Sequence, residues 1–314
     1  MPPFRIAVIS GLVIDLVSVT DRIPDGGETI TSLSFSTHPG GKGANSAVAA
    51  SRLSHAKPEV RHILSVPNAV SEDLSESAPE DLSEGAPESL PEDDIQVRMV
   101  GAVGDDEFGP LLISNLAENH VDVSGVRTAA GQKTGVAVII VETASGENRI
   151  LFNPGANHNL LPTDFLTLES LAGGIRPDLL ILQLEMRLDT VEQILATASR
   201  EGINVLLNPA PAQCLPSSAY RMITHLVVNE SEAATLLSWR ELGELTTENV
   251  GWGGVTDEFL RMGVKNVVVT LGGKGAYFSN SPGSGGLVDA EKDVSVVDTT
   301  GAGYVWYQDL SLEL

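Results

Sequence analysis

The 314-residue sequence has a single cysteine, Cys214, and therefore cannot form an intrachain disulfide. A reducing compartment is the simplest interpretation, with Cys214 as an ordinary small side chain. Lys and Arg are also scarce: 19 of them stand against 42 Asp and Glu residues, and the formal net charge is -23. Nucleic acids and anionic membranes bind basic surfaces, so neither is an expected partner.

Long apolar runs are absent as well. No stretch approaches the roughly 20 apolar residues that a membrane span needs, and the N-terminus lacks the basic region and cleavage site of a signal peptide. We therefore expect a soluble, cytoplasmic protein, with the nucleus as an alternative. The six histidines show no metal-ligand spacing with one another or with Cys214, and neither a Walker A pattern nor a G-x-S-x-G elbow occurs.

Short apolar segments that alternate with amphipathic ones dominate the remaining chain. Nearly continuous β-rich runs of this kind are typical of strands buried on both faces of a parallel sheet. The alternation predicts an α/β fold, namely a doubly wound, mostly parallel sheet flanked by helices, within one domain over residues 1–303. We expect strands at 5–10, 96–103, 178–184, 203–208, 224–229 and 265–272, and helices at 43–53, 108–120 and 189–202.

Two segments do not follow this alternation of strands and helices. Residues 12–37 are rich in β-branched residues around a Pro-Asp-Gly-Gly turn, and residues 133–152 read as a hairpin around Ala-Ser-Gly-Glu-Asn. We expect them to form a small antiparallel sheet that projects from the domain as a lid.

Residues 66–95 form an acidic, low-complexity stretch of Glu, Asp, Ser, Leu, Ala and Pro. Ten acidic residues and no basic residue fall within 71–94. Such a composition predicts a disordered insertion in a surface loop, next to a strand at 60–65. A docking or phosphorylation segment is one interpretation, and a neutral loop expansion is the favoured one.

The segment HPGGKGANSAVAA at 38–50 is the first with the character of a binding site. Glycines there permit close backbone approach at the start of a helix, while Lys42 and Asn45 supply polar groups suited to a polyhydroxylated ligand. Asp15, just after the first strand, can accept bonds from two hydroxyls. Each signal alone is weak, because a glycine-rich helix entry and a loop acid explain them equally well.

Further polar groups follow later strands. Asn229 and Glu232 stand three apart at a helix start, where they suit Mg²⁺ and a nucleotide phosphate. A capping box explains them at least as well. Lys274, in TLGGKGAYF, suits phosphate contact, with a plain strand–turn–strand as the alternative. Finally, DTTGAG at 298–303 predicts an anion hole at a helix N-terminus, which stabilises a transferring phosphoryl group.

Taken together, these motifs resemble the PfkB-type sugar kinases, and most closely their ribokinase branch, from about Phe4 to Gly303 with the acidic insertion as the interruption. The resemblance implies ATP-dependent phosphorylation of D-ribose, with Mg²⁺ and an activating K⁺, and often a homodimer formed through the lid. It implies a sugar site at Asp15, Gly41, Lys42, Asn45 and Glu185, a Mg²⁺–phosphate site at Asn229 and Glu232, an ATP contact at Lys274 and Gly275, a potassium site at Asp298 and Thr300, and an anion hole at Gly301, Ala302 and Gly303.

One position breaks the family pattern. The residue after the anion hole is an aspartate in the family, where it is the general base, and here it is Tyr304. A phenol with a pKa near 10 is a poor base at neutral pH. Residues 304–314 do not resemble the family's continuation, so we interpret the sequence as lacking the C-terminal part of the domain. We expect impaired kinase activity, with an inactive sugar-binding protein or a kinase for another sugar as alternatives.

Overall fold

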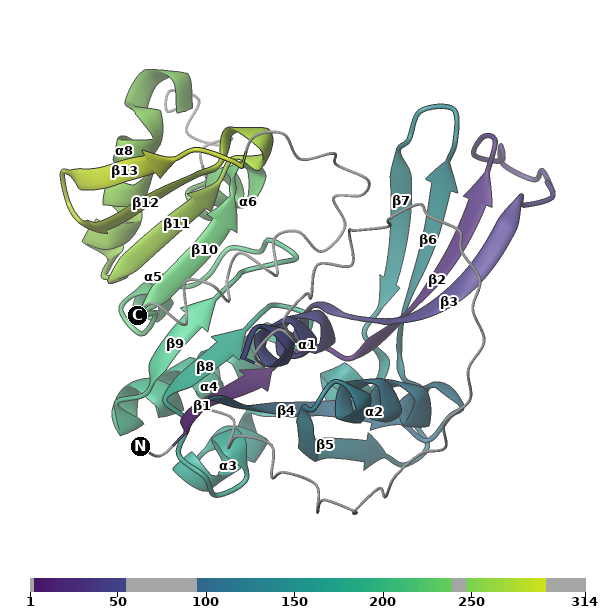
Figure 1. The fold of residues 1–314 in the computed structure, drawn as a ribbon, viewed down its shortest axis with the longest axis horizontal. Coiled ribbons are helices and arrows are strands. Elements are labelled where there is room, and N and C mark those ends of the chain that lie inside the picture. The colour runs from purple at the N-terminus through teal and green to yellow at the C-terminus, as the bar shows by residue number, and fades with distance from the viewer. Residues whose placement is uncertain (1–2, 55–94, 239–246, 292–314) are drawn as a thin grey trace, which may run out of the picture.

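The computed structural model describes residues 3–54, 95–238 and 247–291. Within these ranges the chain forms a large sheet with helices on both faces and a smaller sheet to one side (Figure 1). This arrangement confirms the predicted α/β class. None of the helices described is both long and apolar enough to cross a membrane.

In the described ranges, the large sheet has nine strands in the order β13-β12-β11-β10-β9-β8-β1-β4-β5. The pairs from β5 across to β11 are parallel, and the two pairs at the β13 edge are antiparallel. The strands are β1 (Phe4–Ile9), β4 (Ile95–Gly104), β5 (Asp122–Ala129), β8 (Leu179–Leu182), β9 (Asn204–Leu207), β10 (His225–Asn229), β11 (Asn266–Thr270), β12 (Ala276–Ser281) and β13 (Ser284–Val288).

Alternate residues of the strands belong to two separate hydrophobic cores, one on each face of the large sheet. Ile6 and Val8 of β1 face α1 (Lys42–Ser54) and α2 (Phe108–Glu118), whereas Ala7 and Ile9 face the opposite helical layer. That layer comprises α3 (Leu168–Ala172), α4 (Leu188–Glu201), α5 (Ser217–Tyr220), α6 (Glu230–Leu236) and α8 (Thr247–Met262). Burial on both faces explains why the strands read as continuous apolar runs.

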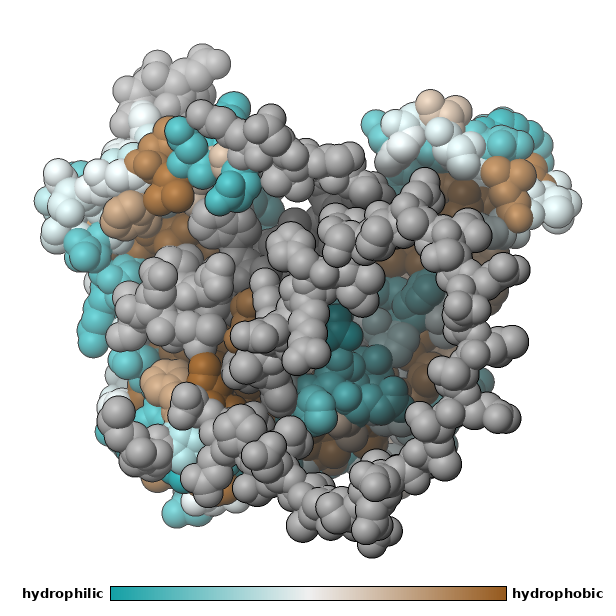
Figure 2. All heavy atoms as spheres, in the orientation of Figure 1, coloured by the Kyte–Doolittle hydropathy of each residue, from teal (hydrophilic) through white to brown (hydrophobic). Residues whose placement is uncertain are grey.

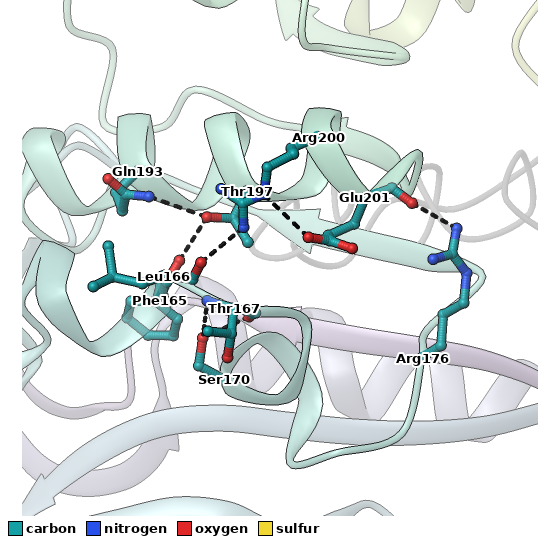
Figure 3. A network of polar contacts seen from close by, with 9 residues as sticks. All are labelled: Phe165, Leu166, Thr167, Ser170, Arg176, Gln193, Thr197, Arg200 and Glu201. Carbon is teal, nitrogen blue, oxygen red and sulfur yellow. Dashed lines mark hydrogen bonds and ion pairs between the residues drawn. The ribbon is translucent and has the colours of Figure 1, made fainter.

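Helix α4 is fixed to the chain that precedes β8 by a polar network, shown in Figure 3. The hydroxyl of the fully buried Thr197 donates a 2.7 Å hydrogen bond to the carbonyl of Phe165, next to the 3-10 helix η2 (Pro162–Phe165). Arg200 donates to the carbonyl of Leu166 at 2.7 Å, and Arg176 donates to the carbonyl of Glu201 at 2.8 Å. This layer is therefore held by hydrogen bonds as well as by packing.

The smaller sheet lies beside the β4–β5 end of the large sheet, at the upper right of Figure 1, and is called the lid below. Its order is β3-β2-β6-β7, with β2 (Val13–Thr20), β3 (Ser34–Gly40), β6 (Gly135–Glu142) and β7 (Asn148–Asn153). The lid was expected to be antiparallel, and this expectation is wrong for one pair, because β2 and β6 run parallel. They are parallel because each enters the lid from the same edge of the large sheet.

The predicted strands and helices of the described ranges are all present, with shifts of at most two residues at their ends. β5, β13 and α8 were not expected from the sequence, and β12 was expected only under the strand–turn–strand alternative for residues 270–278. The predicted strand at 60–65 and nearly all of the acidic insertion lie outside the described residues, and Ile95 already belongs to β4.

Candidate functional site

A cavity of about 430 Å³ lies between the lid and the large sheet. Its lining contains all five residues predicted to hold a sugar, which come from sequence positions 15 to 185. The complete lining is Val13, Asp15, Gly41, Lys42, Asn45, Ala137, Ile139, Ile150, Phe152, Glu185 and Pro211. The fold thus brings distant polar groups to a single hollow.

The lid contributes the apolar wall of this cavity. Ala137 pairs with Phe152 and Ile139 pairs with Ile150 across β6 and β7, so these four side chains share the inner face of the lid. These four residues were not predicted as site residues from the sequence. The signal was present, because every second residue of a strand points to the same face, and the hairpin register was readable from its turn.

The turn between β3 and α1 brings Asp15 close to the glycine motif. Gly40 has no room for a side chain, because a Cβ there would lie 2.2 Å from Oδ2 of Asp15. Gly41 has φ +89°, and its Cβ would lie 2.8 Å from the backbone nitrogen of Val13. The glycines were expected to admit a ligand. In the structure they also allow the close approach of Asp15 and Val13, which places Asp15 beside the start of α1, and Gly41 lines the cavity.

Glu185 is the most deeply buried charged group of the cavity, with 8% of its surface exposed. The backbone N–H of Lys42 donates to Oε2 of Glu185 at 2.7 Å, and the Lys42 ammonium lies 3.9 Å from Oε1. Burial raises the pKa of Glu185 to about 7, and the charge of Asp15 adds to this, against the opposing effect of Lys42. The carboxyl group is thus poised between its charged and neutral forms near neutral pH.

Asp15 has a raised pKa for the same main reason. Burial disfavours its charged form, while the positive charges of Lys42 and His38 oppose that effect. His38 lies directly opposite Asp15 in the β2–β3 pairing. Two carboxyl groups and one ammonium group in a half-apolar cavity are suited to binding the hydroxyls of a small polar molecule.

Asn229 and Glu232 lie at the carboxyl end of β10, where they form the capping box considered as an alternative. Asn229 N–H donates to Oε2 of Glu232 at 2.9 Å, and Glu232 N–H donates to Oδ1 of Asn229 at 2.8 Å. Burial raises the pKa of Glu232, opposed by the Asn229 bond, by Lys42 and by Asn208. The influence of Lys42 shows that Glu232 lies within electrostatic reach of the cavity.

Lys274 and Gly275 lie in the turn between β11 and β12, which includes the 3-10 helix η3 (Gly272–Lys274). The turn joins antiparallel strands, so the strand–turn–strand alternative describes its shape. Gly275 has φ +95°, and its Cβ would lie 1.9 Å from the carbonyl of Val288. Packing of β13 therefore requires this glycine. Neither Lys274 nor Gly275 lines the cavity described above.

The predicted anion hole at Gly301, Ala302 and Gly303, the potassium ligands Asp298 and Thr300, and Tyr304 lie outside the described residues. Within residues 3–54, 95–238 and 247–291, no group of three or more His, Cys, Asp or Glu side chains is arranged to hold a metal ion.

The family model described as pfkB family carbohydrate kinase matches residues 4–75 and 90–303. The chain belongs to the PfkB family. Its relatives include the ribokinase of Schizosaccharomyces pombe, 39% identical over 302 residues that cover 95% of this chain and 81% of that protein.

Solved structures give the same assignment. The ribokinase of Thermotoga maritima matches with a TM-score of 0.73 and 29% identity, over 98% of this chain and 85% of that one. The ribokinase of Cryptococcus neoformans in complex with ADP matches with a TM-score of 0.66 and 25% identity, over 97% and 85% of the two chains. The ribokinase-like fold and a carbohydrate-kinase ancestry are therefore shown.

Proposed function

We propose that this chain is a ribokinase, which transfers the terminal phosphoryl group of ATP to D-ribose and yields ribose 5-phosphate and ADP. The observation that carries the proposal is the convergence of Asp15, Lys42, Asn45 and Glu185 on one cavity beneath the lid. The 39% identity to the S. pombe ribokinase supports ribose, and the ADP complex of the C. neoformans relative supports an adenine nucleotide.

At the sugar end, each group has a role that its chemistry permits. The carboxylates of Asp15 and Glu185 accept hydrogen bonds from hydroxyls, and the Asn45 amide both donates and accepts. Gly41 and Lys42 offer the backbone and the ammonium group at the start of α1. Ile150 and Phe152 cover the sugar from the lid and exclude water, which strengthens these polar contacts.

At the end of the site where the phosphates of ATP would bind, the oxygen ligands of Asn229 and Glu232 fit Mg²⁺. Glu232 is a half-buried carboxylate. Burial raises its pKa, a nearby cation would lower it, and carboxylate oxygens are the hard ligands this ion prefers. Glu232 would hold the ion through water, with Asn229 beside it and Lys274 and Gly275 towards the nucleotide. Mg²⁺ would neutralise charge on the phosphates when bound.

Transfer requires the 5-hydroxyl oxygen of ribose to form a bond to the γ-phosphorus while the bond from that phosphorus to ADP breaks. The negative charge on the phosphoryl oxygens would be stabilised by the N–H groups of Gly301, Ala302 and Gly303, with K⁺ near Asp298 and Thr300. The hydroxyl proton needs an acceptor. With tyrosine at position 304, we expect a rate about 10²–10⁴ lower than with a carboxylate there.

The inactive sugar-binding protein remains the second candidate, and Tyr304 is the observation that favours it. Calorimetry with D-ribose and a coupled assay for ADP, applied to the wild type and Tyr304→Asp, decide between the two. Ribose binding by both proteins, with turnover greatly increased by Tyr304→Asp, is the expected result. If both proteins bind ribose and neither turns it over, the second candidate is supported. If neither protein binds ribose, the proposal is refuted.

We further propose that the protein is a cytoplasmic homodimer joined through the outer face of its lids. Val138 pairs with Leu151 on this face, and their exposed fractions are 38% and 69%. Phe35 of β3 is 63% exposed. In Figure 2 brown residues lie among teal and white ones on the lid, at the upper right. Exposed apolar side chains grouped in this way favour association with a second copy.

A further inference from the structure

Two buried side chains hold the junction between the lid and the large sheet. Thr134, just before β6, accepts a 3.0 Å hydrogen bond from the N–H of Gly104, and Asn157 makes a larger set of bonds. Its Oδ1 accepts a 2.9 Å hydrogen bond from the N–H of Leu12, and its Nδ2 donates to the carbonyl of Leu12 at 2.8 Å. Nδ2 also donates to the carbonyl of Pro154 at 2.9 Å. Leu12 precedes β2 and Pro154 follows β7, so one amide group binds the roots of two lid strands.

A third lid strand reaches the same point. Ala156 N–H donates to the carbonyl of Lys133 at 2.8 Å, just before β6 begins at Gly135. A Cβ on Gly135 would lie 2.6 Å from Nδ2 of Asn157. The glycine therefore makes the space that the amide occupies.

Asn157 itself sits on a segment fixed to the body of the protein, the 3-10 helix η1 (Gly155–Asn159). Thr190 of α4 donates a 2.7 Å hydrogen bond to the carbonyl of Leu160, and Arg127 of β5 donates to the carbonyl of Asn159. Ala156 and Leu160 belong to the buried core. The amide of Asn157 thus connects the ends of the lid strands to a segment that is packed in the core.

We propose that Asn157 is a positioning residue for the kinase reaction, because it sets the lid against the body and thereby the width of the sugar cavity. The part of this proposal that concerns sugar binding rests on the proposed ribokinase function. Asn157 does not line the cavity and would act only through the strands that do.

The link to substrate binding follows from where the cavity walls originate. Asp15, Ile139 and Phe152 belong to the lid, whereas Lys42 and Glu185 belong to the body. A sugar contacts both sets only when the lid is correctly placed. Loosening the junction lowers the fraction of molecules in that arrangement, and the apparent dissociation constant rises in inverse proportion.

Two substitutions separate the contributions of the amide. Asn157→Ala removes all three hydrogen bonds. Asn157→Asp keeps the acceptor for Leu12 N–H but cannot donate to the carbonyls of Leu12 and Pro154. The matched control is Thr197→Val, which removes an equally buried hydrogen bond in α4, far along the chain from the lid (Figure 3).

The test is hydrogen–deuterium exchange of the full chain without ligand, followed by calorimetry with D-ribose and with ATP. We expect amides of β2 and β6 to exchange at least about tenfold faster in both Asn157 variants, while amides of β8 and α4 stay close to wild type. The dissociation constant for ribose should rise about tenfold and that for ATP less than about twofold. Thr197→Val should leave the lid amides and ribose binding unchanged.

Faster exchange spread evenly over both sheets would mean general destabilisation and would overturn the proposal, as would lid amides unaffected by Asn157→Ala. Unchanged ribose affinity in a variant with a loosened lid would overturn the link to the sugar cavity. If the wild type fails to bind ribose, the proposed function fails, while the ligand-free exchange pattern still decides the role of Asn157 at the junction.

Discussion

Lys42 contacts Glu185 twice, through a 2.7 Å bond from its backbone N–H and through its ammonium group at 3.9 Å. The two residues lie 143 positions apart in the sequence. Their pairing joins the start of α1 to the loop after β8, at the carboxyl edge of the large sheet where ligands of α/β proteins bind.

Glu185→Gln should change how stability depends on pH. The folded-state pKa of Glu185 is raised from 4.5 to about 7, so the folded protein holds this proton more tightly than the unfolded chain does. Wild-type stability from this group is therefore lost as pH rises from about 4.5 to about 7, by about 3 kcal/mol in total. Gln can still accept the Lys42 bond. The difference in unfolding free energy, variant minus wild type, should become more positive over this range in urea titrations at pH 5, 6 and 8. If this difference did not change with pH, the raised pKa of Glu185 would be contradicted.

Gly40→Ala should displace Asp15 from the cavity, because the added Cβ would lie 2.2 Å from its carboxylate. We expect the dissociation constant for ribose to rise at least about tenfold, since a charged-group hydrogen bond is worth roughly 1.5–3 kcal/mol. Gly26→Ala is the matched control, because a Cβ there meets nothing within 4 Å. Calorimetry on both variants measures the effect, and equal affinities would refute the role given to Asp15.

Asn229 offers a test that separates its cap from its proposed phosphate contact. Asn229→Ala removes the acceptor for Glu232 N–H and should lower stability by about 1 kcal/mol. Asn229→Asp keeps that acceptor, so its stability should stay within about 0.5 kcal/mol of wild type. Its added negative charge should nonetheless weaken binding of MgATP. Thermal unfolding and nucleotide titration report the two effects, and unchanged MgATP affinity in Asn229→Asp would leave the cap as the sole role.

Leu151→Asp should convert the proposed lid dimer into monomers. The side chain is 69% exposed on the outer face of β7, and a carboxylate there would need to be desolvated on association. Leu166→Asp is the control, because Leu166 is 51% exposed but lies after η2, on the body of the protein. Sedimentation equilibrium measures the mass of each variant, and a wild type that sediments as a monomer would refute the dimer.

The α/β class, most strands and helices, and five of the residues that line the cavity beneath the lid could be predicted from the sequence. Those features follow from local patterns, since continuous apolar runs mark buried parallel strands and glycine motifs mark tight turns. Asp15 and Lys42 carried local signals one by one, whereas Glu185 was expected only from the resemblance to the sugar-kinase family.

How these segments contact one another could not be predicted from local sequence patterns. The parallel pairing of β2 with β6, the apolar wall at Ile150 and Phe152, and the raised pKa of Glu185 all depend on contacts between distant segments. Asn157 had no distinctive sequence signal, because its role arises from backbone groups 145 residues away. Local sequence encodes which face a side chain takes, whereas burial and charge coupling are set by what the fold places opposite it.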